Sequence, residues 1–266
     1  MRKILIFLAI FIGISSLADD VSLWEKSTLN QIIQRGELIV GIEPDYIPFV
    51  MRDKRGSIIG FDVDMANEMA KAMGVKLTLV PTSLDKIIPG LLAKEYDIIM
   101  SGMAITQKRN LEINFTDSYI SMSQTILIDG KHGNKTWKDL DSPEYTIATK
   151  IGSTGEATAL KMFKKANLRT FETADGGTQE LLIGGVDAFI YDRPYNAIFI
   201  SEKGAGRLIH LDDNFTYEPL GWGVRKGDPD FLNWLNNFLL QTKGDGRYVT
   251  IYNRWFGSDI WLNRVL

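Results

Sequence analysis

The chain of 266 residues contains no cysteine and only two histidines. Without disulfides, a fold in an oxidising compartment must bury a sizeable hydrophobic core, and a lipid anchor on a cysteine is excluded. His132 and His210 lie far apart and have no companion at ligand spacing, which argues against a zinc site and a Ser-His-Asp hydrolase. We therefore expect no metal site. We also predict no cofactor and no catalytic residue.

The chain also lacks a second long apolar run after the one at its N-terminus. Arg2 and Lys3 precede the apolar run Ile4–Ile14, and small residues follow up to Ala18. This run is too short for an ordinary membrane-spanning helix and predicts a secretory signal, residues 1–18, cleaved after Ala18. Its loss removes two basic residues and takes the formal net charge from −3 to −5. An acidic, exported chain argues against nucleic acid and anionic membranes as main partners.

The apolar residues of the remaining chain alternate between strand and helix periods. Phe61–Met73 shows an apolar stripe at helical spacing that stops at Gly74, and short apolar strands lie on either side of it. The pattern restarts near Tyr145, after the β-rich run Tyr119–Ile128, and the chain is expected to cross back near Thr216–Pro219. We therefore predict an α/β protein of two lobes with parallel sheets.

Two polar segments follow predicted strands and are expected to face one crevice. Glu43–Tyr46 follows the first strand, and Ser101–Arg109 follows a later strand of the same lobe. Ligands in α/β sheets bind at the carboxyl ends of the strands. Gly102 allows a close approach of the backbone, and an arginine beyond such a turn presents a planar fork suited to a carboxylate.

Six motifs in order carry a family resemblance: LIVGIEPDYIPFV, GFDVDMANEMAKAMG, SGMAITQKR, IGSTGEA, GVDAFIYDRP and GWGVRKGDPD. Together they resemble periplasmic solute-binding proteins of the polar amino acid ABC transporter family, similar to those that bind lysine, arginine and ornithine or histidine. The resemblance implies the two-lobed periplasmic-binding-protein fold, with two α/β domains joined by two hinge strands. Lobe 1 would comprise residues 19–121 and 218–266, and lobe 2 residues 122–217. It also implies a periplasmic monomer that closes on a free L-amino acid and serves an inner-membrane ABC permease.

The resemblance assigns roles to positions in both lobes. Arg109 would bind the ligand carboxylate, assisted by the helix start at Gly152, Ser153 and Thr154, where free N–H groups suit an anion. Asp192 would bind the α-ammonium. The plain alternatives are a surface arginine, an ordinary hydroxyl-capped helix start and a turn aspartate before a proline.

The remaining pocket positions concern the ligand ammonium and side chain. Ser101 and Gly102 would complete the ammonium pocket, and Tyr46 would cover the side chain. Glu43 would pair with a cationic side-chain tip, which favours lysine first, then arginine, ornithine or histidine; the alternative is a solvated loop glutamate. Asp187 competes with Asp192, but an aspartate at a strand start more often makes turn hydrogen bonds.

Two departures from the family pattern leave other functions open. Leu84 stands where an aromatic side chain is common, and Ala104 stands where a hydroxyl often supports the carboxylate contact. One alternative is a cyclohexadienyl dehydratase on the same scaffold, with Glu43 or Glu156 as general acid. Another is a solute sensor that acts through a separate partner protein.

Overall fold

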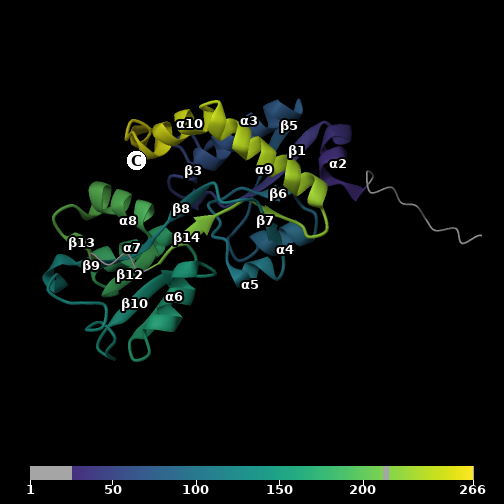
Figure 1. Ribbon diagram of the computed structural model, residues 1–266. Coiled ribbons are helices and arrows are strands. Elements are labelled where there is room, and N and C mark those ends of the chain that lie inside the picture. The colour runs from purple at the N-terminus through teal and green to yellow at the C-terminus, as the bar shows by residue number, and fades with distance from the viewer. Residues whose placement is uncertain (1–25, 212–215, 266) are drawn as a thin grey trace, which may run out of the picture.

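The computed structural model describes residues 26–211 and 216–265. The predicted secretory signal and its cleavage site lie outside the described residues. Two α/β lobes lie side by side and are joined by a pair of crossing strands (Figure 1). The prediction of two α/β domains in the periplasmic-binding-protein fold is confirmed.

Each lobe has a mixed five-stranded sheet, and the two sheets share one layout. The lobe 1 order is β5-β1-β6-β15-β7 and the lobe 2 order is β11-β10-β12-β9-β13. The lobe 1 strands are β1 (Glu37–Ile42), β5 (Lys76–Pro81), β6 (Ile98–Ile99), β7 (Asn114–Phe115) and β15 (Gly223–Val224). The lobe 2 strands are β9 (Gln124–Asp129), β10 (Thr146–Lys150), β11 (Asn167–Phe171), β12 (Ala188–Asp192) and β13 (Leu208–Leu211).

The expectation of purely parallel sheets is wrong at one edge of each lobe. The first three strands in each order pair in parallel. In lobe 1, β15 runs antiparallel to both of its neighbours, β6 and β7, and in lobe 2, β9 runs antiparallel to both β12 and β13. Strands β9 and β15 enter their sheets directly from the crossing strands. They make no helical crossover of the kind that a parallel neighbour needs.

Helices cover the sheets and end at recognisable signals. Phe61–Met73 is helical as predicted, and Gly74 ends it with a φ of 70°. The predicted helix Gly152–Ala166 is shorter, Thr154–Met162, because Ser153 caps its N-terminus. In lobe 1 the helices are α2 (Thr28–Arg35), α3 (Phe61–Met73), α4 (Ile87–Leu92), α5 (Gln107–Asn110), α9 (Pro229–Gly244), α10 (Arg247–Phe256) and α11 (Leu262–Val265). In lobe 2 they are α6 (Thr154–Met162), α7 (Ala174–Ile183) and α8 (Arg193–Phe199), with short 3₁₀ and π turns at Gly130–His132 and Ile200–Gly204.

The two crossing strands are β8 (Ile120–Met122) and β14 (Glu218–Leu220), which pair antiparallel. They fall where the sequence predicts the crossings. The domain boundaries at residues 121/122 and 217/218 lie within or beside this pair and remain a prediction. A small sheet of β2 (Asp45–Tyr46), β3 (Val50–Arg52) and β4 (Ile58–Ile59) lies beside the main sheet of lobe 1.

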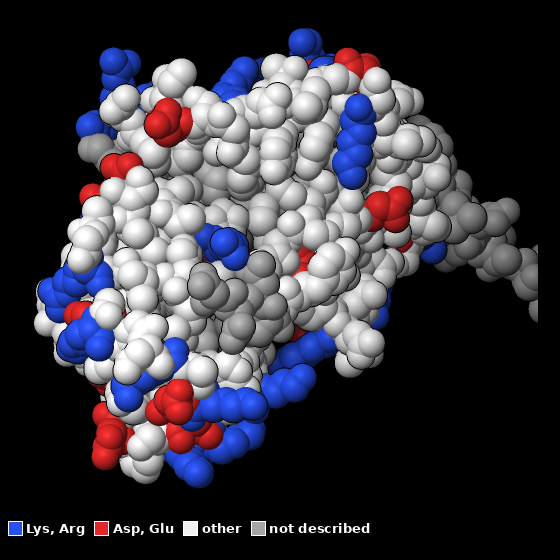
Figure 2. Space-filling view, turned by 60° about the vertical axis from the view of Figure 1, so that its left-hand side comes forward, with Lys and Arg blue, Asp and Glu red and all other residues white. Residues whose placement is uncertain are grey.

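The core is large and rich in aromatic residues, in line with a fold that uses no disulfide. Phe61 stacks on Tyr119, which stacks in turn on Trp222, and all three side chains are buried. On the face shown in Figure 2, lysine and arginine gather along the lower edge, interleaved with aspartate and glutamate. Among residues 26–211 and 216–265, none of the helices is long and apolar enough to span a membrane.

Candidate functional site

A pocket with an empty volume of about 340 Å³ lies between the lobes, where β1, β6, β10 and β12 end. The side chains fill most of this space, and the room open to a water-sized molecule is about 20 Å³, enough for about one water. Its wall contains ten of the eleven predicted site residues; Gly152 is absent from it, and Met103 and Tyr191 were not predicted. The lining residues are Glu43, Tyr46, Leu84, Ser101, Gly102, Met103, Ala104, Arg109, Ser153, Thr154, Tyr191 and Asp192.

Arg109 is held from both lobes by backbone carbonyls. It lies in α5, whose N-cap Thr106 accepts the Arg109 N–H. Its Nη1 donates to Ala104 O at 3.0 Å and its Nη2 donates to Gly152 O, in lobe 2, at 3.1 Å. Burial lowers the pKa of Arg109, while the negative charges of Glu218 and Asp192 raise it. Arg109 is half-buried and lies in the pocket wall, and Gly152 takes part through its carbonyl oxygen.

Gly102 is required by its surroundings. Its φ is +59°, and a Cβ at this position would lie 2.3 Å from Cε1 of Tyr46. Ser101 holds the neighbouring loop, since the Glu43 N–H donates to its hydroxyl at 2.9 Å. The Gly102 N–H donates to Asp62 Oδ2 at 2.7 Å. The backbone of this turn is therefore fixed closely against the pocket.

Asp62 lies behind the pocket wall and holds the Gly102 turn, and the sequence analysis missed it. Besides Gly102, its carboxylate accepts from Tyr119 Oη at 3.0 Å and from Trp222 Nε1 at 3.2 Å. Burial raises the pKa of Asp62 to about 6, against the lowering effect of these three donors. The available signal was an aspartate inside the apolar stripe of the predicted helix.

Asp192 is buried at the end of β12 and accepts a hydrogen bond from the Tyr46 hydroxyl of lobe 1. Burial and the nearby charge of Glu218 raise the pKa of Asp192 to about 7. The Tyr46 ring packs against Phe49 and Tyr191, at 4.8 and 5.6 Å between centroids. The Asp187 carboxylate instead accepts the Thr146 N–H, a hydrogen bond to the start of the neighbouring strand β10 rather than the predicted turn bond.

The start of α6 is engaged by the chain itself. Thr154 Oγ1 donates to Glu218 Oε2 at 2.6 Å and accepts from Gln124 Nε2 at 2.9 Å. Ser153 Oγ caps the helix by accepting the Glu156 N–H, and the Glu156 carboxylate accepts the Gly152 N–H at 2.8 Å. Burial raises the pKa of Glu218, which lies on the crossing strand β14.

Glu43 lies in the pocket wall and is only 5% exposed, so the solvated-loop alternative is wrong. Its carboxylate pairs with the Lys150 ammonium of lobe 2, at 2.5 Å between Oε1 and Nζ. Burial raises the pKa of Glu43, and the Lys150 charge lowers it. Lys150, at the end of β10, is completely buried. The sequence analysis did not single it out, because a lysine at a strand end is usually solvated.

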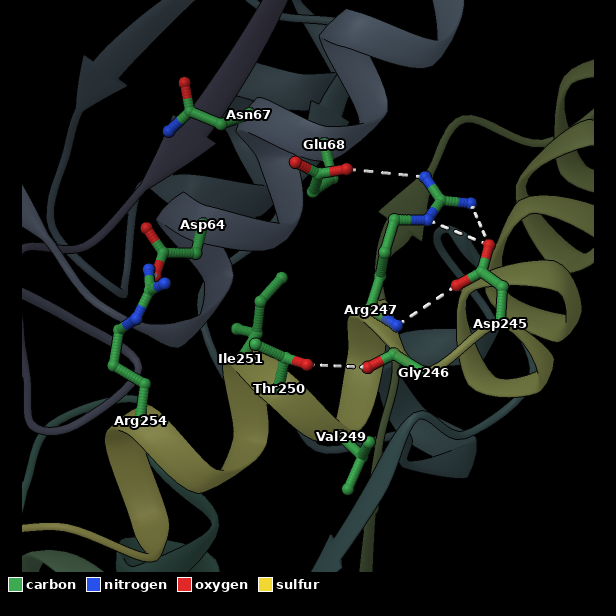
Figure 3. Close-up of a pocket in the computed structure, with 10 residues that line it drawn as sticks. All are labelled: Asp64, Asn67, Glu68, Asp245, Gly246, Arg247, Val249, Thr250, Ile251 and Arg254. Atoms are coloured by element: carbon green, nitrogen blue, oxygen red, sulfur yellow. Dashed lines mark hydrogen bonds and ion pairs between the residues drawn. The ribbon is translucent and has the colours of Figure 1, made fainter.

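A wider groove of about 1020 Å³ lies between α3 and α10, wholly within lobe 1 (Figure 3). Its charges neutralise one another: Arg254 pairs with Asp64 at 2.7 Å, and Arg247 pairs with Asp245 and Glu68 at 2.6 and 3.4 Å. The pocket between the lobes differs, because ionisable groups from two lobes converge there. Among the described residues, no group of three or more His, Cys, Asp or Glu could hold a metal ion.

The fold and pocket together define a two-lobed solute-binding protein in a closed arrangement, with hydrogen bonds from lobe to lobe at Arg109, Tyr46 and Lys150. The family profile of the bacterial extracellular solute-binding proteins, family 3, matches residues 38–258. The chain therefore belongs to this family, as the motifs predict. The expectation of a binding protein rather than an enzyme is confirmed at this level.

Three relatives illustrate the family. A solved structure described as a putative binding component of an ABC transporter from Wolinella succinogenes, complexed with lysine, is 55% identical, with a TM-score of 0.82; the match covers 86% of this chain and 99% of that one. The reconstructed ancestral amino acid-binding protein AncCDT-1, called a precursor of cyclohexadienyl dehydratase, is 42% identical with a TM-score of 0.80 over 86% and 99% of the chains. The L-cystine-binding protein TcyJ of Escherichia coli K12 is 29% identical over 89% of this chain and 88% of its own.

Proposed function

We propose that this protein is the periplasmic substrate-binding component of an ABC uptake system and closes around a free L-amino acid. The observation that carries the proposal is the convergence of Arg109 and Asp192, an opposite charge from each lobe, on one pocket. A free amino acid carries a carboxylate and an ammonium, and both need a partner once they are desolvated.

In this proposal Arg109 binds the ligand carboxylate, and the helix start at Gly152, Ser153 and Thr154 adds donors from lobe 2. Asp192 binds the α-ammonium. In this structure Arg109, Asp192 and Thr154 have Gly152, Tyr46 and Glu218 as their partners. A ligand would exchange those contacts for its own, and only contacts made in the closed form stabilise closure.

Around the ammonium and side chain, Ser101 and Gly102 supply backbone and hydroxyl groups from lobe 1. Tyr46 and Leu84 cover the ligand side chain, and Ala104 contributes only its carbonyl, which orients Arg109. With aliphatic Leu84 in place of a second ring, Tyr46 supplies the main aromatic contact.

The proposed ligand class is a cationic amino acid, with lysine first and arginine, ornithine or histidine next. Glu43 in the pocket wall supports this class, as does the lysine complex of the 55% identical relative. TcyJ, whose name gives L-cystine as its ligand, represents the neutral alternative within the family. A carboxylate in the pocket wall attracts a cationic side chain, and such a ligand would meet Glu43 while Glu43 is paired with Lys150.

The proposal includes export through the predicted signal 1–18 and cleavage after Ala18. It also includes action as a monomer that delivers its ligand to an inner-membrane permease. A solute sensor would bind the same ligands and differ only in the partner protein. Deletion of the permease genes that match this receptor should abolish uptake of the ligand if the transport role is correct.

The first experiment is thermal unfolding of the ligand-stripped mature protein against the common L-amino acids, with prephenate and arogenate included. A ligand that binds only the native state raises stability by about 2.7 kcal/mol at a hundred-fold excess over Kd. Stabilisation only by cationic amino acids supports the proposal. Stabilisation only by cystine or other neutral amino acids keeps the binding role and overturns the ligand class. No stabilisation by any amino acid, with consumption of prephenate, would instead indicate a dehydratase.

A further inference from the structure

The Glu43 carboxylate, proposed above to take the ligand cation, is paired with a cation of the protein itself. Lys150 reaches it from lobe 2, with 2.5 Å between Nζ and Oε1, and is completely buried. A ligand side chain with a positive charge must therefore either share Glu43 with Lys150 or displace it. Two ammonium groups at one carboxylate repel each other, and a buried ammonium without a partner is costly.

A second carboxylate stands within reach of Lys150. Asp45 Oδ2 lies 3.9 Å from the Lys150 Nζ, too far for a hydrogen bond, and this buried oxygen has no hydrogen-bond partner. A small rotation of the terminal torsions of Lys150 would close that distance. Asp175 also lies near Asp45, and its charge is paired with Lys203 at 2.9 Å. Asp45 is therefore a prepared second position for the ammonium.

We infer that Lys150 is a specificity-determining residue with two positions, at Glu43 and at Asp45, and that a ligand cation takes Glu43 as Lys150 moves to Asp45. This inference rests on the proposed function. In the first position Lys150 supplies the cation that Glu43 needs when the ligand side chain is neutral. In the second position the Lys150–Asp45 pair and the ligand–Glu43 pair leave no charge unpaired.

The exchange makes opposite predictions for removal of Asp45 and for removal of Lys150. Asp45→Asn removes the second position of the Lys150 ammonium. A ligand cation then has to share Glu43 with Lys150, so the affinity for the ligand lysine should fall about tenfold or more. Lys150→Met removes the competitor, and lysine affinity should rise about tenfold or more. In the double variant the loss from Asp45→Asn should vanish, because no ammonium remains to be received.

The test is isothermal titration calorimetry of the full mature protein with L-lysine and with L-norleucine. Norleucine has the carbon skeleton and the α-ammonium of lysine but lacks the side-chain ammonium. Norleucine affinity should change by less than about twofold in Asp45→Asn, since a neutral side chain leaves Lys150 at Glu43. Lys161→Met and Asp117→Asn are matched controls that remove the same charges from exposed positions on the same lobes. Thermal unfolding of each variant reports whether it folds.

The results separate this inference from the proposed function. Wild-type protein that binds neither lysine nor any other amino acid refutes the proposed function. Wild-type protein that binds lysine, with lysine affinity lowered in both single variants or unchanged in both, overturns the exchange and leaves Lys150 a structural residue. Parallel changes for lysine and norleucine overturn it as well. If Lys150→Met does not fold, the lysine-selective loss in Asp45→Asn and its absence in a Lys150→Gln/Asp45→Asn variant carry the test.

Discussion

The pair of Glu43 and Lys150 should be strongly coupled in the stability of the ligand-free protein. Its atoms are 2.5 Å apart, and the two side chains are 7% and 0% exposed. Removing one partner of such a buried pair leaves the other charge unpaired and typically costs about 3–5 kcal/mol. In Glu43→Gln, Asp45 at 3.9 Å offsets part of this loss for Lys150. In Lys150→Met, the buried Glu43 and the half-buried Asp45 remain as two carboxyls without Lys150, so this variant should lose more stability.

The double variant Glu43→Gln/Lys150→Met contains neither charge and should cost clearly less than the sum of the two single changes. We expect a coupling free energy of about 2–3 kcal/mol from the double-mutant cycle. The assay is urea unfolding at pH 7 followed by tryptophan fluorescence, with Trp222 reporting on the core. Equal slopes against urea in all four proteins make the midpoints comparable as stabilities.

A surface pair provides the matched control. Arg169 and Glu180 are 2.9 Å apart in lobe 2, but their side chains are 51% and 29% exposed. Exposed pairs contribute about 0–1 kcal/mol. The cycle of Arg169→Met and Glu180→Gln should therefore show little coupling. A coupling at Glu43 and Lys150 no larger than at this control pair would refute the argument that burial makes the pair strong.

Three further predictions concern the pocket. Arg109→Ala should abolish calorimetric binding of every amino acid while the protein still unfolds cooperatively; retention of normal affinity would contradict its role. Because the α-ammonium needs ionised Asp192, whose pKa is about 7, affinity measured by titration should fall as pH drops below 7, by about tenfold per unit. Glu218→Gln removes a charge that raises this pKa and should move the midpoint to lower pH, and an unmoved midpoint would count against Asp192. Asp62→Asn should cost about 1–3 kcal/mol in urea unfolding, since an amide cannot accept from all three donors. The pKa of Asp62 in the folded protein is about 6, above its ordinary value of 3.8, so the protonated carboxyl stabilises the folded protein at low pH. The wild type should lose this stabilisation as the pH rises from about 4 to 6, and Asp62→Asn should not.

Local periodicity and ordered motifs determined much of this protein from the sequence. The helix Phe61–Met73 has its predicted bounds, because an apolar stripe and a terminal glycine act over neighbouring residues. The positions of the crossing strands followed from the β-rich run Tyr119–Ile128 and the segment Thr216–Pro219, and the family followed from the order of the motifs. Ten of the eleven predicted site residues line one pocket, because strand ends of an α/β sheet meet at one edge.

What the tertiary structure decided are the contacts between residues far apart in the chain. Local periodicity does not encode strand direction, so the antiparallel entry of β9 and β15 required the three-dimensional path of the crossing strands. Asp62 resembled an ordinary helix residue until its three distant donors were in place. Lys150 meets Glu43 across 107 positions of sequence, and only closure of one lobe on the other makes that pair. The sequence supplied a carboxylate for the pocket, and the packing of the two lobes determined which cation it meets.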